Sequence, residues 1–195
     1  MKKLLAILIL VLTLQTPSHA DDIRDFQIEG MSLGDSLLDY FSKKEIENNR
    51  IEFTSNNRKY SYTEIFGGFN EFENIQFMYK KNDKKYRIAS INGVLFFKNN
   101  LKKCLSKKDT IVKSVNSIIS QDTKINNTDA YPHSKKFSKS MVYTSEFNFK
   151  NGDQIRVYCI NWTKKIENKK GWSDHLGLNI TTNEFFYWLN NVAYK

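Results

Sequence analysis

Apolar residues recur along the chain with two periods, and each period predicts one kind of element. Across residues 99–119 the spacing is three to four positions, which places the apolar side chains on one face of a helix. Asn99 or Asn100 would cap this helix. The apolar positions are Leu101, Cys104, Leu105, Ile111, Val112, Val115, Ile118 and Ile119. The pattern therefore puts Cys104 on the buried side and most of its neighbouring lysines in solvent.

Alternation over residues 75–79 and 86–90 predicts a hairpin with a two-residue turn at Asn82-Asp83. Such a turn places the apolar residues of both strands on one face of the sheet. The expected register pairs Tyr79 with Tyr86 and Phe77 with Ile88, and Asn92-Gly93 is expected to bend or bulge the second strand.

The stretch MVYTSEFNFKNGDQIRVYCINW, residues 141–162, predicts a second hairpin. A two-residue turn would put its two apolar faces out of phase, whereas a three-residue loop from Lys150 to Gly152 keeps them in phase. The expected pairs are Phe147–Ile155, Ser145–Val157 and Tyr143–Cys159, with Glu146 opposite Arg156 on the other face. Cys159 then points to the core side.

Cap and turn residues delimit the remaining segments. Residues 48–68 and 121–139 are polar and predict loops, and residues 175–180 predict a last strand. The mature start predicts a short strand and then a helix that Asp35 caps, with Leu37, Leu38 and Phe41 on one face and a capping box at Ser42 and Glu45. At the other end Thr182 caps a helix whose inward residues are Phe185, Phe186 and Leu189.

The predicted order of elements is helix, hairpin, helix, hairpin, strand and helix. Antiparallel neighbours with helices to one side are typical of α+β domains. We therefore expect an antiparallel sheet built from two hairpins plus a further strand, with helices packed on one face. A hairpin followed by a helix occurs twice, which would fit a remote internal duplication, although the sequence shows no residue-level repeat.

Residues 1–20 have the composition of a cleaved secretory signal peptide. Two lysines precede an apolar run over residues 4–14, and Ala20 is the small residue before the expected cut. The run is short for a membrane-spanning helix, and no cysteine near the cut could carry a lipid. We expect cleavage between Ala20 and Asp21 and a single periplasmic or secreted domain at 21–195, with a net charge of +7 instead of +9.

Export bears on the state of the two cysteines, Cys104 and Cys159. They are an even number in an oxidising compartment, where an unpaired thiol tends to oxidise. A bridge would close a loop of about 55 residues, worth about 4 kcal/mol in the chain-entropy model. A reactive thiol beside lysines is the alternative, but the helical pattern turns those lysines away. We expect a disulfide.

No residue spacing indicates catalysis or a cofactor. The chain has no nucleophile elbow, no zinc-protease motif, no phosphate-binding loop and no dinucleotide fingerprint. His133 and His175 show no metal-ligand spacing. We therefore expect no catalytic residue, no metal ligand and no cofactor, while an enzyme with an unrecognised site stays open.

Lysine is abundant and the net charge of the whole chain is +9. Lysine pairs occur at 80–81, 84–85, 102–103, 107–108, 135–136, 164–165 and 169–170. They could bind an anionic polymer or lipid head groups, or they could follow from AT-rich codons, because asparagine, isoleucine, phenylalanine and tyrosine are frequent too. The pairs are scattered, and bidentate phosphate recognition favours arginine. A solvated surface is preferred, and specific nucleic-acid binding is not expected.

Aromatic residues gather in and after the first predicted loop, and two tryptophans follow the second hairpin. They are Tyr60, Tyr62, Phe66, Phe69 and Phe72, followed by Trp162 and Trp172. These side chains could line a ligand groove or a protein-binding patch. The preferred reading is that they cover the open face of a small sheet.

Three segments carry a resemblance to known proteins. DFQIEGMSLGDSLLDYFS, YRIASINGVLFFKNN and GDQIRVYCINW resemble small uncharacterised exported bacterial proteins, which implies no activity. More remotely, Gly30, Gly34 and Ser36 before a helix and hairpin are similar to the beta-lactamase-inhibitor-like module, which outer-membrane assembly lipoproteins share. The chain lacks the lipidated cysteine of those lipoproteins. This second resemblance favours a binding module and implies no site residue.

These observations predict a secreted or periplasmic, non-catalytic binding module with an unknown protein partner. The alternative is a basic surface protein that binds anionic envelope polymers or lipid head groups, and a further alternative is an enzyme. Salt separates the first two, because polyanion binding weakens steeply as ionic strength rises.

Overall fold

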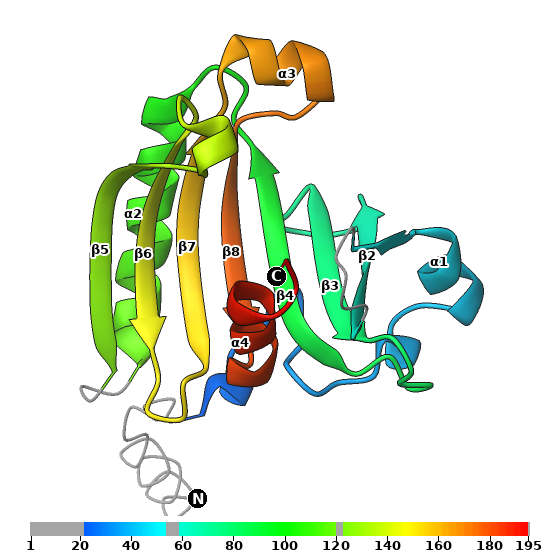
Figure 1. The fold of residues 1–195 in the computed structure, drawn as a ribbon. Coiled ribbons are helices and arrows are strands. Elements are labelled where there is room, and N and C mark those ends of the chain that lie inside the picture. Colours follow the sequence, from blue (N-terminus) through cyan, green and yellow to red (C-terminus); the bar gives the residue numbers. More distant parts are fainter. Residues whose placement is uncertain (1–21, 54–58, 120–122, 195) are drawn as a thin grey trace, which may run out of the picture.

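In the described part of the chain the fold is an eight-stranded antiparallel sheet with helices on both of its faces (Figure 1). The computed structural model describes residues 22–53, 59–119 and 123–194. The strands are β1 (Arg50–Glu52), β2 (Tyr60–Phe66), β3 (Asn74–Lys80), β4 (Ile88–Phe96), β5 (Lys124–Pro132), β6 (Met141–Asn148), β7 (Gln154–Asn161) and β8 (His175–Thr181). The helices are α1 (Lys43–Asn48), α2 (Leu101–Ile118), α3 (Lys164–Lys170) and α4 (Asn183–Asn191).

The strands form two four-stranded meanders that meet in the middle of the sheet. The order is β1-β2-β3-β4-β8-β7-β6-β5, so the last strands of the two meanders, β4 and β8, are antiparallel neighbours. Helix α1 precedes the first meander and α2 precedes the second. Each half is therefore a helix followed by four strands, with α3 added between β7 and β8 in the second half, and this is a topological repeat of the kind that an internal duplication would leave.

One face of the sheet, the core face, carries the apolar interior. Ile75, Phe77, Ile91, Ile155 and Val157 point to this face, and each is at most 1% exposed. The N-terminal segment and α2 cover it, and Figure 1 shows α2 lying along the second meander. Alternation of apolar and polar residues in the strands explains this one-sided core.

A disulfide joins α2 to the core face. Cys104 on α2 and Cys159 on β7 are bonded, with their Cα atoms 6.1 Å apart. Both are buried, together with Leu176 of β8. The bridge forms because Cys104 lies on the apolar stripe of its helix and Cys159 on the core side of its strand. The predicted pairing is confirmed, and a disulfide is consistent with an oxidising compartment.

The second hairpin, β6–β7, has the predicted register. Phe147 pairs with Ile155, Ser145 with Val157, Tyr143 with Cys159 and Glu146 with Arg156. Gly152 has a φ of +85°, which a residue with a side chain rarely adopts. The phase argument from the apolar residues therefore identified this loop correctly.

The predicted register of the first hairpin, β3–β4, is wrong. Tyr79 pairs with Ile88 instead of Tyr86, and Phe77 pairs with Ile91 instead of Ile88. The ladder is irregular between Met78 and Tyr79, whereas Asn92 and Gly93 continue it without a bulge. The apolar residues still share the core face.

The longer connection between β3 and β4 accounts for this difference. The Asp83 carboxylate accepts hydrogen bonds from the backbone N–H of Lys85 (3.0 Å) and that of Arg87 (3.4 Å). Tyr86 adopts a φ of +49°, and its ring packs on Tyr79 at 5.3 Å between centroids. Tyr86 therefore belongs to the turn and not to the ladder.

The two segments predicted as loops instead contain strands β1, β2 and β5. In β2 the core-facing Thr63 is polar, but its hydroxyl donates to the Ile46 carbonyl (3.1 Å) and contacts the Tyr79 hydroxyl (3.0 Å). Strand β5 lies at the edge of the sheet and pairs only with β6 among the named strands. Polar sequence is tolerated in both places, since one strand satisfies its polar group internally and the other meets solvent.

The N-terminal prediction of a strand and a helix is also wrong. Residues Ile23–Asp25 and Leu37–Asp39 form short 3-10 helices. Ser36, not Asp35, is the N-cap, and the Asp35 carboxylate accepts from the Tyr40 hydroxyl (2.7 Å) instead. Leu37 is buried, whereas Leu38 is 42% exposed. Because a 3-10 turn brings fewer residues onto one face, the predicted apolar stripe does not form.

Two other predicted caps are confirmed. Ser42 accepts a hydrogen bond from the Glu45 backbone N–H at 3.2 Å, and Thr182 accepts one from that of Phe185 at 3.3 Å. Helix α4 packs against β4 on the face opposite α2, so the helices do not all lie on one side as expected. The α+β class is confirmed. The predicted signal peptide, 1–20, and the cut between Ala20 and Asp21 lie outside the described residues.

Candidate binding cleft

A row of polar side chains crosses the sheet on the side opposite the core face, which we call the polar face. From β2 to β6 the register brings these residues opposite one another in the order Glu64, Gln76, Asn92, Asn179, Arg156 and Glu146. Outward from the central asparagine pair, each meander presents a long polar side chain and then a glutamate. The topological repeat therefore extends to single residues of the polar face.

Short sequence correspondences explain this row. Asn74-Ile75-Gln76 on β3 matches Gln154-Ile155-Arg156 on β7 in register relative to the central pair. In both strands the isoleucine enters the core, and its two neighbours point to the polar face. The match is visible only when the two meanders are aligned through the sheet, because the connections between their strands differ in length.

Glu64, Gln76 and Asn92 of the polar row hydrogen-bond to one another and to two neighbours, Asn74 and Tyr158. The Tyr158 hydroxyl donates to Asn92 Oδ1 (3.2 Å), and Asn92 Nδ2 donates to Gln76 Oε1 (3.0 Å). Gln76 Nε2 then donates to Glu64 Oε1 (3.0 Å), which also accepts from Asn74 Nδ2. This relay crosses the sheet from β7 to β2. It fixes which way each amide points, so the floor of the face is ordered before any ligand binds.

Tyr158 can join the relay because Gly177 leaves room for its ring. Tyr158 lies on β7 and reaches Asn92 on β4 by crossing β8, where a Cβ on Gly177 would stand 2.2 Å from the ring. The Arg156 guanidinium lies 4.7 Å from the centre of the same ring, a favourable cation–π position. Burial raises the pKa of the Tyr158 phenol, so its hydroxyl remains a donor at neutral pH.

Two aromatic clusters cover opposite ends of the polar face. At one end α4 places Phe185 and Trp188 against Tyr60, with ring centroids 5.0 and 4.9 Å away. At the other end Trp162 packs against Trp172 (4.7 Å) and against residues that precede β6. The first cluster is closed by a helix, and the second is formed by loops. The polar row runs between them.

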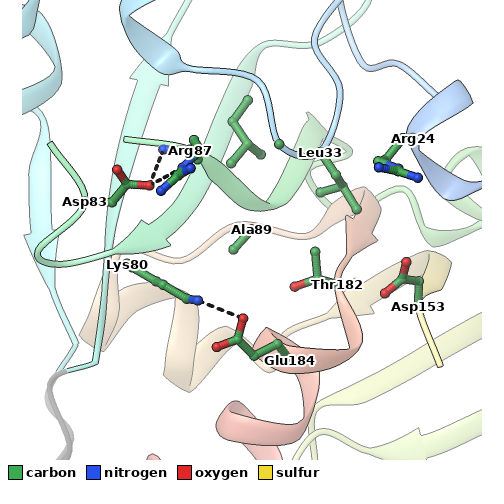
Figure 2. A pocket seen from close by; sticks show the side chains of 11 residues that line it. Arg24, Leu33, Lys80, Asp83, Arg87, Ala89, Asp153, Thr182 and Glu184 are labelled. Atoms are coloured by element: carbon green, nitrogen blue, oxygen red, sulfur yellow. Dashed lines mark hydrogen bonds and ion pairs between the residues drawn. The ribbon is translucent and has the colours of Figure 1, made fainter. Parts of the chain in front are cut away.

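Ion pairs fix α4 to the ends of β2 and β3. Glu184, in the first turn of α4, lies 2.9 Å from the ammonium of Lys59 and 2.9 Å from that of Lys80; Figure 2 shows the second contact. Hydrogen bonds from these two lysines lower the pKa of the Glu184 carboxyl to about 2. A carboxylate at this position also complements the dipole of the helix.

The hollow beside these ion pairs, drawn in Figure 2, has a volume of about 370 Å³. Its charged side chains all have partners in the protein. Arg87 contacts Asp83 at 2.7 Å, Arg24 pairs with Asp22, and Asp153 accepts from the Asn183 backbone N–H at 2.7 Å. We therefore regard this hollow as part of the scaffold that seats α4.

A larger cleft of about 600 Å³ opens on the polar face at the end away from α4. It is lined by Tyr62, Glu64, Phe66, Asn74, Gln76, Val94, Phe96, Lys98, His133, Trp162, Gly171, Trp172, Ser173 and His175. Its floor is the Glu64 end of the relay. Phe66 from the first meander is 66% exposed, and Trp172 from the second half is 41% exposed. Exposed aromatic side chains beside an ordered polar floor are typical of a binding site.

Three polar atoms at the cleft have no hydrogen-bond partner among the described residues: Asn74 Oδ1, Trp162 Nε1 and His133 Nδ1. Asn74 is 1% exposed, and its Oδ1 is unpaired while its Nδ2 is bound to Glu64. Trp162 is 7% exposed, and its Nε1 is unpaired. Since a buried polar group without a partner is costly, these atoms are candidates to contact a ligand.

The cleft carries little net charge at neutral pH. Burial lowers the pKa of His133 and that of His175, so both imidazoles are neutral. His175 Nδ1 lies 2.8 Å from the Ser173 carbonyl oxygen, to which it must donate, and this leaves Nε2 as an acceptor. The charged residues that line the cleft are Glu64 and Lys98, whose charges balance.

The structure divides the aromatic residues that the sequence grouped together. Tyr62 and Phe66 line the cleft, as do both predicted tryptophans. Tyr60 is covered by α4, and Phe69 and Phe72 pack on the core face. Four of these aromatic side chains therefore line the cleft, and the other three pack against α4 or the core face.

The lysine pairs do not form the cleft. Several of their members are engaged elsewhere, such as Lys81 with Glu52 (3.2 Å) and Lys164 with Glu167 (2.6 Å). The lysine that lines the cleft is Lys98, which belongs to no pair. The pairs thus give no concentrated positive site at the cleft.

The polar residues of the cleft were not identified from the sequence. Glu64 lies in a segment predicted as a loop, and Asn74 and Gln76 are ordinary amides between apolar strand residues. The available signal was the alternation itself. Where every second residue of a central strand is an amide, the second face of the sheet is polar, and such a face needs a partner or solvent.

Among the described residues, no three or more histidine, cysteine, aspartate or glutamate side chains gather as a metal site requires. None of the helices in the described ranges is long and apolar enough to cross a membrane. No family model matches the chain, and neither a curated protein nor a solved structure matches it.

Proposed function

We propose that the protein is an exported, non-catalytic binding module and that the cleft on the polar face is its binding site. The observation that carries this proposal is the ordered floor between two exposed aromatic walls. A relay that fixes the amides before binding lowers the entropic cost of recognition. Exposed Phe66 and Trp172 provide apolar contact area whose burial by a partner is favourable.

The chemistry of the cleft supports binding more than catalysis. Glu64 is the carboxylate that lines it, and its Oε1 already accepts two amide N–H groups. His175 is oriented by a backbone carbonyl and not by a carboxylate. General acid–base catalysis usually needs two titratable groups with distinct roles near one reacting atom. Glu64 lies close enough to His175 to act on its charge, but the hydrogen bonds of the described residues join neither imidazole of the lining to a carboxylate.

Export is part of the proposal and rests on two independent features. The leader over residues 1–20 has the composition of a signal peptide. The disulfide between Cys104 and Cys159 fits an oxidising compartment. The protein partner in the envelope or the medium that the sequence predicted stays a prediction, as does the resemblance to inhibitor-like modules.

Binding of anionic polymers or head groups is the second candidate function. It is favoured by the exposed lysines on the outer side of α2, among them Lys102, Lys103 and Lys113. These lie on the opposite side of the sheet from the cleft. The two functions therefore use separate surfaces and can be tested separately.

The test of the proposed function is capture from the native envelope fraction by the purified mature protein. We expect Phe66→Ala/Trp172→Ala to lose at least about tenfold of the retained partner, since aromatic anchors dominate interface energies. Tyr187→Ala is the matched control, because Tyr187 is 61% exposed on α4 and does not line the cleft. Equal retention by all three proteins would refute the cleft as the site. Retention that depends on Lys102 and Lys103, and falls steeply with salt, would instead support the anionic alternative.

A further inference from the structure

We propose that the ligand recognised by the cleft is an uncharged saccharide chain, with one sugar ring stacked on Trp172. This inference rests on the proposed function, because it names the chemistry of the ligand at the same site. It is carried by three features of the cleft: the aromatic platform, the unpaired polar atoms and the balance of charge.

Trp172 is held as a platform at the edge of the cleft. Its ring packs on Trp162 (4.7 Å between centroids) and on Phe137 (5.4 Å), yet it stays 41% exposed. Gly171, with a φ of +69°, ends α3 and turns the chain directly before it. A sugar ring presents a patch of C–H groups on one side, and these groups carry a slight positive charge. The negative face of an indole attracts them.

The polar atoms of the cleft match hydroxyl groups. A hydroxyl donates one hydrogen bond and accepts two, so a sugar needs both donors and acceptors around it. His175 Nε2 can accept, and an unpaired acceptor, Asn74 Oδ1, and an unpaired donor, Trp162 Nε1–H, lie just beneath the surface of the lining. Glu64 Oε1 is occupied by Asn74 and Gln76, and its second oxygen completes the set of acceptors. Each of these residues lines the cleft.

The distribution of charge disfavours a polyanion in the cleft. The charged lining residues are Glu64 and Lys98, so an acidic ligand in the cleft would meet a carboxylate as well as an ammonium group. The two histidines are neutral at neutral pH because they are buried. An uncharged ligand avoids placing an unpaired charge against this floor.

The sheet also disfavours an extended peptide as the ligand. Peptides that bind sheets usually add a strand at an exposed edge, where the backbone groups are free. The floor of the cleft belongs mostly to β3, β4 and β8, each of which has a strand on both sides, whereas β2 pairs with β1 only as far as Thr63. A ligand on this floor must therefore be bound by side chains. A sugar suits such a site, because its hydroxyl groups project from the ring and can meet those side chains.

The experiment titrates the mature, disulfide-bonded protein with four uncharged hexasaccharides: cellohexaose, chitohexaose, maltohexaose and mannohexaose. Heparin and a neutral hexapeptide serve as comparison ligands. Calorimetry measures affinity, and the amide spectrum of the ¹⁵N-labelled protein locates binding. We expect at least one hexasaccharide to bind and to shift signals of residues that line the cleft. We expect Trp172→Ala to weaken this binding at least tenfold and Tyr187→Ala to leave it within twofold.

Asn74→Asp provides the second, smaller change. It keeps the size of the side chain but replaces the amide that donates to Glu64 with a carboxylate, so it disturbs the floor without removing the platform. We expect a several-fold weaker saccharide affinity. The amide spectrum away from the cleft reports that the variant is folded.

The possible outcomes distinguish a failure of the saccharide proposal from a failure of the proposed binding function. If no hexasaccharide binds at millimolar concentration, or if binding is indifferent to Trp172→Ala, the saccharide proposal is overturned. If envelope capture still depends on Phe66 and Trp172 in that case, the binding module stands with another ligand. Binding of the peptide in the cleft, without any saccharide, would replace the sugar by a peptide. Heparin binding at α2 alone would locate a separate site and, without a saccharide in the cleft, would also overturn the proposal.

Discussion

The two ends of the polar face begin from the same architecture and differ in what covers them. At the α4 end, Phe185 and Trp188 bury Tyr60 completely, and Glu184 ties the helix to the strand ends. At the other end the aromatic cluster around Trp162 comes from loops, and Trp172 stays partly exposed. Packing at the α4 end therefore stabilises the fold, whereas the aromatic side chains at the other end remain accessible to solvent. The same kind of surface becomes scaffold or candidate site according to whether the chain provides a helix to close it.

The largest predicted effect concerns the disulfide between Cys104 and Cys159, which lies on the core face of the sheet. The double substitution Cys104→Ala/Cys159→Ala removes the disulfide between two cysteines that are 55 residues apart in sequence. We expect the free energy of unfolding to fall by about 4 kcal/mol, because the unfolded chain gains freedom. Urea denaturation measures this change. Reduced wild-type protein should behave alike, and a loss below about 1 kcal/mol would contradict the expectation.

The next prediction compares one tryptophan from each end. Trp188 is 3% exposed and Trp172 is 41% exposed. We expect Trp188→Ala to cost at least about 3 kcal/mol, since it leaves a cavity under α4. Trp172→Ala should cost about 2 kcal/mol or less, because its ring is partly exposed and loses mainly its two ring contacts, with Trp162 and Phe137. Thermal or urea unfolding of the two variants side by side tests the contrast, and equal losses would remove the distinction between a closed and an open end.

Gly177→Ala tests the relay that runs between the ends. The added methyl group would meet the Tyr158 ring, so the ring must move and its hydrogen bond to Asn92 would be lost. We expect a loss of about 2 kcal/mol from overpacking. In a Tyr158→Leu background the same substitution should cost clearly less, since the clashing ring is gone. An unchanged cost in that background would show that Gly177 acts through its backbone alone.

The smallest predicted effect on the free energy of unfolding comes from removing the ion pairs of Glu184, which hold α4 to the strand ends. Glu184→Gln removes two ion pairs, but the Glu184 side chain is 51% exposed, so we expect a loss of less than about 1 kcal/mol at pH 7. The folded-state pKa is lowered to about 2 from an ordinary value of 4.5. The contribution is therefore present above about pH 4.5 and disappears as the pH falls toward 2. Wild-type and variant stabilities should converge over that interval in a pH series of urea melts.

The sequence predicted elements wherever the periodicity was strong and local. The 18-residue helix α2 and the β6–β7 register followed from apolar spacing and from one loop glycine, Gly152. The disulfide followed from those two elements, because each placed its cysteine on a core-facing position. The β3–β4 register failed at Asp83 and Tyr86, where side-chain contacts extend the turn beyond what a dipeptide pattern can show. Strand β2 was missed since Thr63 is stabilised in the core by partners distant in sequence.

The candidate site was less predictable than the fold. Tyr62, Phe66, Trp162 and Trp172 stood out by residue type, but the sequence also grouped them with aromatics that belong to the core. Glu64 and Gln76 carried no signal of their own. They form part of the polar floor of the cleft because the strand register places them in one row with Asn92.

By itself the sequence determined the α+β class, the central helix, the second hairpin and the pairing of its two cysteines. Each follows from the short-range spacing of apolar residues, because the geometry of a helix or strand places residues with that spacing on one face. Only the tertiary structure decided that β4 and β8 meet in the middle, that α4 closes one end of the polar face and that a cleft remains at the other. Those outcomes depend on which surfaces pack together over long sequence distances, and no local pattern encodes that choice.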